Sequence, residues 1–204
     1  VPHRPAVTVA VSAAGALVAA HRGDRETAER LLRVAGREPV GTLAVLHAAR
    51  ATLAELADRP REALDELLPL LDVEEMPPFW YRWLPGIARL MVRTGDRDRA
   101  ERLASIGDDR SLPVEARVLK AYCRGILAEN PDEIRAVVSY CRATDGLGLM
   151  HAHALADLAW LLARRGAARE AQEVLGDALA RLRAIGAEAD RRRAGAGVEA
   201  PALV

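Results

Sequence analysis

Cysteine, lysine and aromatic residues are scarce in this sequence of 204 residues. Its two cysteines, Cys123 and Cys141, are too few for a disulfide framework and are typical of a reducing compartment. No apolar run reaches the roughly 18 residues that a membrane-spanning helix needs. Acidic and basic side chains balance at 29 each, so no net charge attracts the chain to nucleic acid or to an anionic membrane surface. We therefore expect a cytoplasmic chain that neither crosses a membrane nor binds nucleic acid directly.

Alanine and leucine dominate the apolar half of the sequence, which has only three Trp, three Tyr and one Phe. Alanine and leucine lose little entropy in a helix, so this composition favours helices over strands. The apolar residues 6–20 follow His3 and Arg4 and so resemble a secretory signal. The alternative is the first helix of the fold, which we favour because Leu17 and Val18 fit the repeat described next.

The phrase GDRETAERL at residues 23–31 returns as GDRDRAERL at residues 95–103. Its glycine can end a helix in the left-handed conformation. The aspartate that follows, Asp24 or Asp96, can cap the next helix. Five residues after each glycine stands an alanine, whose small side chain lets two helices approach closely. The phrase therefore predicts the corner of an antiparallel helix pair and not a chemical site.

The same corner pattern fits five positions: Gly23, Asp58, Gly95, Glu129 and Gly166. They lie 34 to 37 residues apart, the period typical of tetratricopeptide helix pairs. We therefore predict an all-α fold, a right-handed solenoid of about five antiparallel helix pairs of tetratricopeptide-like type. First helices are expected at 7–21, 42–57, 79–94, 113–128 and 148–165, and second helices at 24–36, 60–71, 97–106, 131–144 and 168–186.

This array is expected to occupy residues 1–186 as one domain. From Ala187 the periodicity is lost, so residues 187–204 are expected to form a fraying helix and a tail or linker. Two prolines refine the map. Asn130 and Pro131 predict the start of a helix, and Pro85 predicts a kink or the true start of the helix around it.

Three stretches resemble the helical-repeat arm of large ATP-binding LuxR-type transcriptional regulators of actinobacteria. They are residues 82–104 (RWLPGIARL…), 112–145 (LPVEARVLK…) and 153–193 (HALADLAWLL…). In that family a phrase like RGAAREAQEVLGDALARLRAIGA commonly closes the arm before a helix-turn-helix domain, and a P-loop ATPase module precedes it. This sequence has no GxxxxGK[ST] phosphate loop and no helix-turn-helix after Arg193, so neither ATP binding nor DNA binding is carried over. The resemblance implies a sensor and interaction arm.

The stretch PPFWYRW and two arginines after it supply the candidate partner-binding surface: Trp80, Tyr81, Arg82, Arg89 and Arg93. Aromatic side chains could offer a stacking platform or a peptide anchor. The arginines, spaced i, i+7 and i+11, could meet carboxylates or phosphates from one helix face. The competing interpretations are a hydrophobic plug between hairpins and an ordinary solvated charge stripe.

Other chemistry-bearing residues do not combine into a site. His151 and His153 are two residues apart on an expected helix and point to different sides, whereas metal pairs on helices use i, i+4 spacing. Cys123 and Cys141 are expected to be buried thiols about one turn out of register. We therefore expect a non-enzymatic module without cofactor or metal, which binds a protein or small-molecule effector on its concave face and could self-associate. A free-standing tetratricopeptide adaptor is the alternative, and an enzyme with a site between helices is disfavoured.

Overall fold

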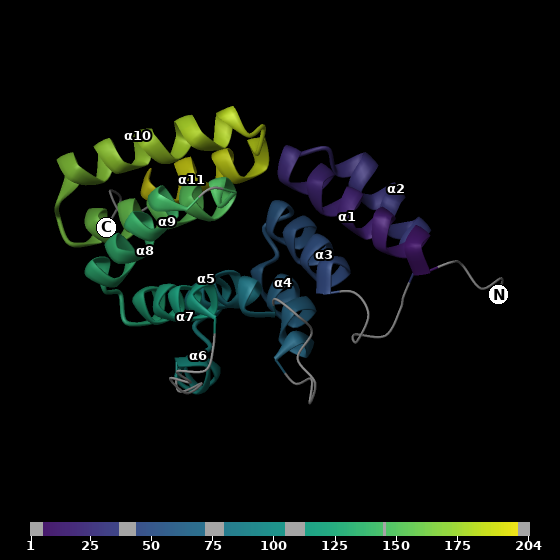
Figure 1. Cartoon of the computed structure of the whole chain (residues 1–204), viewed down its shortest axis with the longest axis horizontal. Helices are drawn as coiled ribbons and strands as arrows, with labels where there is room; N and C mark the ends of the chain where they lie inside the picture. The colour runs from purple at the N-terminus through teal and green to yellow at the C-terminus, as the bar shows by residue number, and fades with distance from the viewer. Residues whose placement is uncertain (1–5, 37–43, 72–79, 105–112, 145, 200–204) are drawn as a thin grey trace. The chain divides into compact units, whose positions relative to one another are not determined.

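The computed structural model describes residues 6–36, 44–71, 80–104, 113–144 and 146–199 (Figure 1). Within these ranges all regular secondary structure is helical, which confirms the predicted all-α class. The first helices are α1 (Ala6–Arg22), α2 (Arg25–Ala35), α3 (Ala44–Leu56), α4 (Pro60–Leu67) and α5 (Leu84–Thr94), with short 3-10 helices at Leu68–Leu70 and Trp80–Trp83. The later helices are α6 (Arg97–Ala104), α7 (Val114–Leu127), α8 (Pro131–Ala143), α9 (Gly148–Arg164), α10 (Ala168–Ala184) and α11 (Glu188–Glu199).

The chain divides into two compact units, Val1–Gly95 and Asp96–Val204. The boundary falls between Gly95 and Asp96, inside the third predicted hairpin. The expectation of a single array over residues 1–186 therefore stays a prediction.

In the first unit, neighbouring helices pack on one another through small side chains. Helix α1 lies beside α2 and packs on α3, and α3 packs on α4, which meets α5 (Figure 1). Ala19, Ala20 and Ala28 form a buried cluster against which Leu53 of α3 packs. Because alanine projects only a methyl group, the backbones of α1 and α2 can approach closely while Leu53 fills the remaining space.

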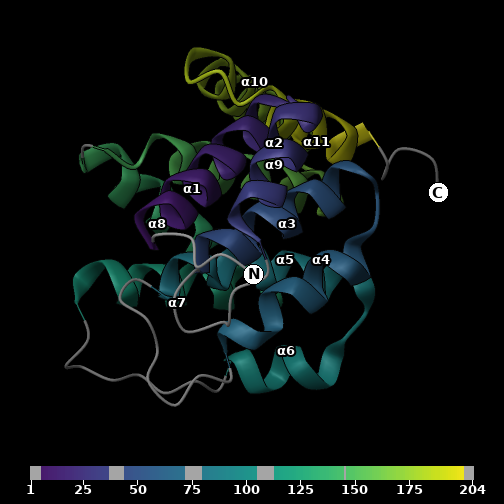
Figure 2. The same cartoon turned by 90° about the vertical axis from the view of Figure 1, so that its right-hand side faces the viewer.

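In the second unit, each helix from α6 to α11 packs on the next, and α11 also packs on α9. Figure 2 shows α10 and α11 alongside α9. Ala152, Leu182 and Ala187 form the buried cluster that these three elements share. Between α7 and α8 the contact depends on Gly125, since a Cβ added there would lie 2.6 Å from Cδ1 of Ile134.

All five predicted corners have the left-handed backbone conformation. Their φ angles are 80° at Gly23, 54° at Asp58, 70° at Gly95, 49° at Glu129 and 78° at Gly166. At four of them the backbone N–H of the next residue donates to a carbonyl five residues earlier: Asp24 to Ala19, Arg59 to Ala54, Asn130 to Gly125, and Ala167 to Leu162. This bond satisfies a carbonyl that the end of the helix leaves free.

The expected helix caps are also present. The Asp24 side chain accepts from the backbone N–H of Thr27 at 3.1 Å, and the Asn130 side chain accepts from Asp132 at 3.1 Å. Asp96 Oδ1 accepts from the backbone N–H of Arg99 at 3.4 Å. The corner prediction is therefore confirmed in backbone geometry and in capping.

The helix expected at 79–94 is a 3-10 helix over Trp80–Trp83 followed by α5, because Pro85 fits only the first turn of an α-helix. After Ala187, where a fraying helix is expected, α11 spans Glu188–Glu199 and buries Ala189 and Asp190. Gly186, with a φ of 71°, is a sixth corner that sequence spacing missed, since it follows Gly166 after a single helix.

Candidate functional site

The residues of the predicted partner-binding surface lie in the 3-10 helix Trp80–Trp83 and in α5. Tyr81 is only 7% exposed, so its side chain belongs to the packing of the first unit. The Trp80 side chain lies outside the described part of the structure. Arg82 lies in the 3-10 helix, so helical spacing does not place it above Arg89, which is half-buried on α5. A binding role for these residues stays a prediction.

Arg93 makes contacts within the first unit. Its guanidinium lies 3.0 Å from Oδ1 of Asp58 and 3.7 Å from Oε1 of Glu55. Asp58 is the corner of the preceding helix pair, so this ion pair joins two successive helix pairs. Arg93 therefore holds α5 to the α3–α4 corner.

The same joint recurs in the second unit. Arg164 lies 3.3 Å from Oε1 of Glu129, and Arg165 donates to the Glu129 backbone carbonyl at 2.8 Å. Arg93 and Arg164 both stand two residues before a glycine corner, and each pairs with the acidic corner of the repeat before it. After the glycine corners Gly23 and Gly95, the residue two positions before the next corner is a leucine and not an arginine. Both acidic corners, Asp58 and Glu129, therefore pair with an arginine that lies two residues before the next corner.

A polar cluster that sequence reasoning missed lies between α9 and α11. His153 Nε2 is 2.9 Å from Oδ1 of Asp190, and Arg193 Nη2 donates to the same oxygen at 2.7 Å. The Asp190 side chain is 2% exposed, that of His153 16% and that of Arg193 31%. Two donors on a buried carboxylate compensate its loss of hydration. The one sequence feature that could have indicated this cluster is Asp190, an acidic residue four positions after the corner glycine Gly186.

A second polar contact joins α7 to α9, where the Tyr122 hydroxyl donates to Oδ2 of Asp157. Tyr122 is almost completely buried, and a buried phenol normally needs such a partner. These two residues are 35 apart, one repeat, as are Arg93 and Asp58. Asp157 and His153 of α9 therefore both bond to side chains of other helices, α7 and α11.

His151 and His153 point to different sides of α9, as predicted. His153 meets α11, whereas His151 is 3% exposed and its Nε2 has no hydrogen-bond partner in the described structure. Burial lowers the pKa of His151, and the nearby Arg181 and Arg142 lower it further. Across the described residues, no three His, Cys, Asp or Glu side chains gather in a way that could hold a metal ion.

A histidine–carboxylate pair also lies between α3 and α4. His47 Nδ1 is 3.2 Å from Oε2 of Glu66, and Arg50 Nη1 lies 3.9 Å from the same oxygen. Arg50 Nη2 also donates to the Gly36 carbonyl at the end of α2 at 2.7 Å. The group thus ties three helices together, and His47 is itself only 8% exposed.

Both cysteines are buried free thiols, as the sequence predicted. Burial raises the pKa of Cys123 to about 12 and that of Cys141 to about 11. A thiol is nucleophilic only as the thiolate, so neither side chain is activated for covalent chemistry.

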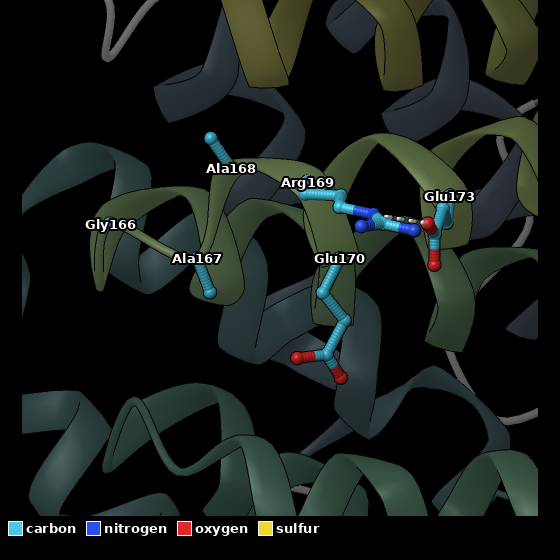
Figure 3. A pocket seen from close by; sticks show the side chains of 6 residues that line it. All are labelled: Gly166, Ala167, Ala168, Arg169, Glu170 and Glu173. Atoms are coloured by element: carbon cyan, nitrogen blue, oxygen red, sulfur yellow. Dashed lines mark hydrogen bonds and ion pairs between the residues drawn. The ribbon is translucent and has the colours of Figure 1, made fainter.

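The start of α10 carries an open depression of about 470 Å³, lined by Gly166, Ala167, Ala168, Arg169, Glu170 and Glu173. Figure 3 shows that these residues come from a single corner and the first turns of one helix. Arg169 Nε is 3.1 Å from Glu173, and Glu170 accepts from Arg135 of α8 at 2.8 Å. The charged groups pair with one another, and the depression has no opposing wall from another element.

Comparison of the chain with protein-family models, with curated proteins and with solved structures finds no match in any of the three. Every helix within the described ranges is too short or too polar to cross a membrane.

Proposed function

We propose that this chain is a non-enzymatic helical-repeat module, a right-handed solenoid of the tetratricopeptide-like type, that binds a protein or small-molecule effector. The observation that supports it best is the recurrence of one corner geometry at five positions spaced 34 to 37 residues apart. Repeat arrays bind through extended surfaces built from successive repeats. The open depression on α10 and the paired state of the polar side chains accord with such a surface better than with an enclosed reaction centre.

The finer proposal is that this module is the arm of a LuxR-type ATP-dependent transcriptional regulator. It rests on the resemblance of residues 82–104, 112–145 and 153–193 to such arms. The arm would act by binding its effector more tightly in one assembly state than in another, because only differential affinity shifts an equilibrium. A free-standing adaptor would share the surface but not the attached ATPase and DNA-binding modules.

Hydrogen exchange on the full chain tests the repeat architecture. Ile134 of α8 and Leu182 of α10 are both fully buried in the second unit. Truncating either to alanine should cost about 2–5 kcal/mol. In a repeat array, Ile134→Ala removes amide protection mainly from α7 and α8, and Leu182→Ala removes it mainly from α9 to α11. If both variants lose protection equally over the whole unit, the fold is one cooperative domain and the repeat proposal is wrong.

Effector binding is tested separately by thermal shift of the full chain with a panel of common metabolites and nucleotides. A compound that raises Tm in proportion to the logarithm of its concentration supports a sensor. The coding DNA on either side decides between the regulator and the adaptor. A phosphate-loop module upstream or a helix-turn-helix downstream supports the regulator, and stop codons flanking this stretch without either module support the adaptor.

A further inference from the structure

Helix α1 is apolar on the face that it buries and also on the face that it exposes. Residues 6–20 contain no charged side chain, and α1 packs on α2 and α3. The exposed stripe, here called the outer face of α1, consists of Val7, Val11, Ala14 and Val18. Val7 is 74% exposed, Val11 66% and Val18 50%. The terminal repeat of a helical array normally has a polar outer face that keeps the array soluble. The outer face of α1 is therefore that of an internal repeat.

In the next helix pair the same places are covered. The residues of the outer face lie 35 positions before residues of α3, as the corner Gly23 lies 35 positions before the corner Asp58. By this spacing Leu46 corresponds to Val11, Ala49 to Ala14 and Leu53 to Val18. Leu46 and Ala49 are fully buried, and Leu53 is half-buried. The places that α1 exposes are therefore the places through which α3 packs on the pair before it.

The contact that α3 makes shows what kind of surface fits these places. The residues that receive Leu46 and Leu53 are all small or aliphatic and come from both helices of the preceding pair. They are Val9, Ala13, Ala19 and Ala20 of α1, and Ala28 and Ala35 of α2. No charged side chain belongs to either cluster. A matching occupant of the outer face of α1 is thus an antiparallel helix pair that offers small and aliphatic side chains from both of its helices.

We propose that the outer face of α1 is the docking surface of a further antiparallel helix pair of the same repeat, N-terminal to α1. The docked pair packs on α1 as the α1–α2 pair packs on α3, so the contact continues an interface that the first unit already contains. Burial of the three valines then gives their exposed apolar surface a partner. This inference rests on the repeat architecture in the proposed function, and it does not depend on the effector or on the attachment to a regulator.

The coding frame before Val1 gives the first test. A corner residue of the kind found in the other pairs should lie 34 to 37 residues before Gly23, at the spacing of the five known corners. An alanine should follow that corner by five positions, as Ala28 follows Gly23. A stop codon closer to Val1 than this corner, or a frame without the corner and its alanine, would overturn the proposal.

Cysteine labelling at Val11 tests the contact itself. Val11→Cys is compared in the present chain and in a chain extended by the preceding repeat, roughly 40 residues that the gene encodes before Val1. The exposed thiol should react freely with an alkylating reagent in the present chain and at least about ten times more slowly in the extended chain, because burial blocks access and suppresses the thiolate. The matched control is Val114→Cys, since Val114 is a 53% exposed valine on α7. Its labelling rate should be the same in both chains.

Other occupants of the outer face give different labelling results. Protection of Val11→Cys that grows with the concentration of the present chain would show that a second copy covers the face. Protection at every concentration would show that another part of the same chain covers it. Either result, or equal labelling rates in the present and extended chains, would overturn the docking of a preceding helix pair. Hydrogen exchange in the Ile134→Ala and Leu182→Ala variants reports on the second unit only, so failure of this inference and failure of the proposed function are distinguishable.

Discussion

Two glycines, one just before α10 and one inside it, allow a matched test of whether the left-handed backbone conformation explains the glycine at a corner. Gly166 is the corner, with a φ of 78°, whereas Gly176 lies in the interior of α10. Both are exposed, and a Cβ added at either would have no atom within 4 Å. An alanine at either place therefore changes backbone energetics and not packing.

The two substitutions should have opposite signs. For Gly166→Ala, holding alanine in the left-handed conformation costs about 1–2 kcal/mol. Alanine also lowers the conformational entropy of the unfolded chain relative to glycine, which stabilises the folded state by about 0.4–1 kcal/mol. The net loss is about 1 kcal/mol. For Gly176→Ala, the exchange of a helix-interior glycine for alanine should stabilise by about 1 kcal/mol.

Thermal unfolding followed by circular dichroism measures both effects. For a chain of this size, 1 kcal/mol moves Tm by about 2–4 °C, so the two variants should lie about 4–8 °C apart. Gly125→Ala adds a third case, because its Cβ would meet the buried Ile134 and should destabilise by about 1–3 kcal/mol through overpacking. If Gly166→Ala and Gly176→Ala shift Tm in the same direction, the left-handed corner does not explain the glycine at Gly166.

Three further predictions concern polar and ionisable side chains in the second unit. Asp190→Ala should remove the acceptor that His153 and Arg193 share and cost about 2–3 kcal/mol, with amide protection lost first in α11. Glu188→Ala on the same helix removes only a partly exposed pair with Arg191 and should cost less than Asp190→Ala, so equal losses in the two variants would exclude the buried carboxylate as the cause. Because burial holds the pKa of His151 below its usual 6.5, the folded chain binds this proton less readily than the unfolded chain. Stability should therefore fall as pH drops below about 6.5, and His151→Leu should flatten the curve of unfolding free energy in that range; an unchanged slope contradicts the assignment. Cys123 and Cys141 should resist alkylation at pH 8 in the native state, since pKa values of about 12 and about 11 leave only about one molecule in ten thousand and one in a thousand as thiolate. Both should react on unfolding, and rapid native labelling of either would show that its burial is wrong.

The helical class and most helix ends could be predicted because they depend on local chemistry. The left-handed corners, the Asp24 and Asn130 caps and the proline at the start of α8 each act within a few residues of themselves. Alanine and leucine at helical spacing then fix which face of each helix turns inward. Even the two acidic corners, Asp58 and Glu129, could be placed from the corner pattern and its spacing.

The candidate surface could not be predicted in the same way. Tyr81 and Arg93 stand where an exposed binding stripe would place them, yet Tyr81 is buried and Arg93 pairs with Asp58. The packing of α11 on α9 could not be predicted because the sequence of α11 lacks the helical hydrophobic pattern. Asp190 of α11 pairs with His153 of α9, and Ala187, just before α11, packs in a cluster with Ala152 of α9 and Leu182 of α10.

The sequence by itself determined where most of the helices begin and end, because corners and caps are local arrangements of glycine, aspartate and asparagine. Only the tertiary structure decided which polar side chains join one helix pair to another, because Tyr122 and Asp157, or Arg93 and Asp58, are 35 residues apart and meet only when the helices pack. It also decided which apolar face is left uncovered. In sequence the outer face of α1 looks like the covered face of α3, and only packing distinguishes the two.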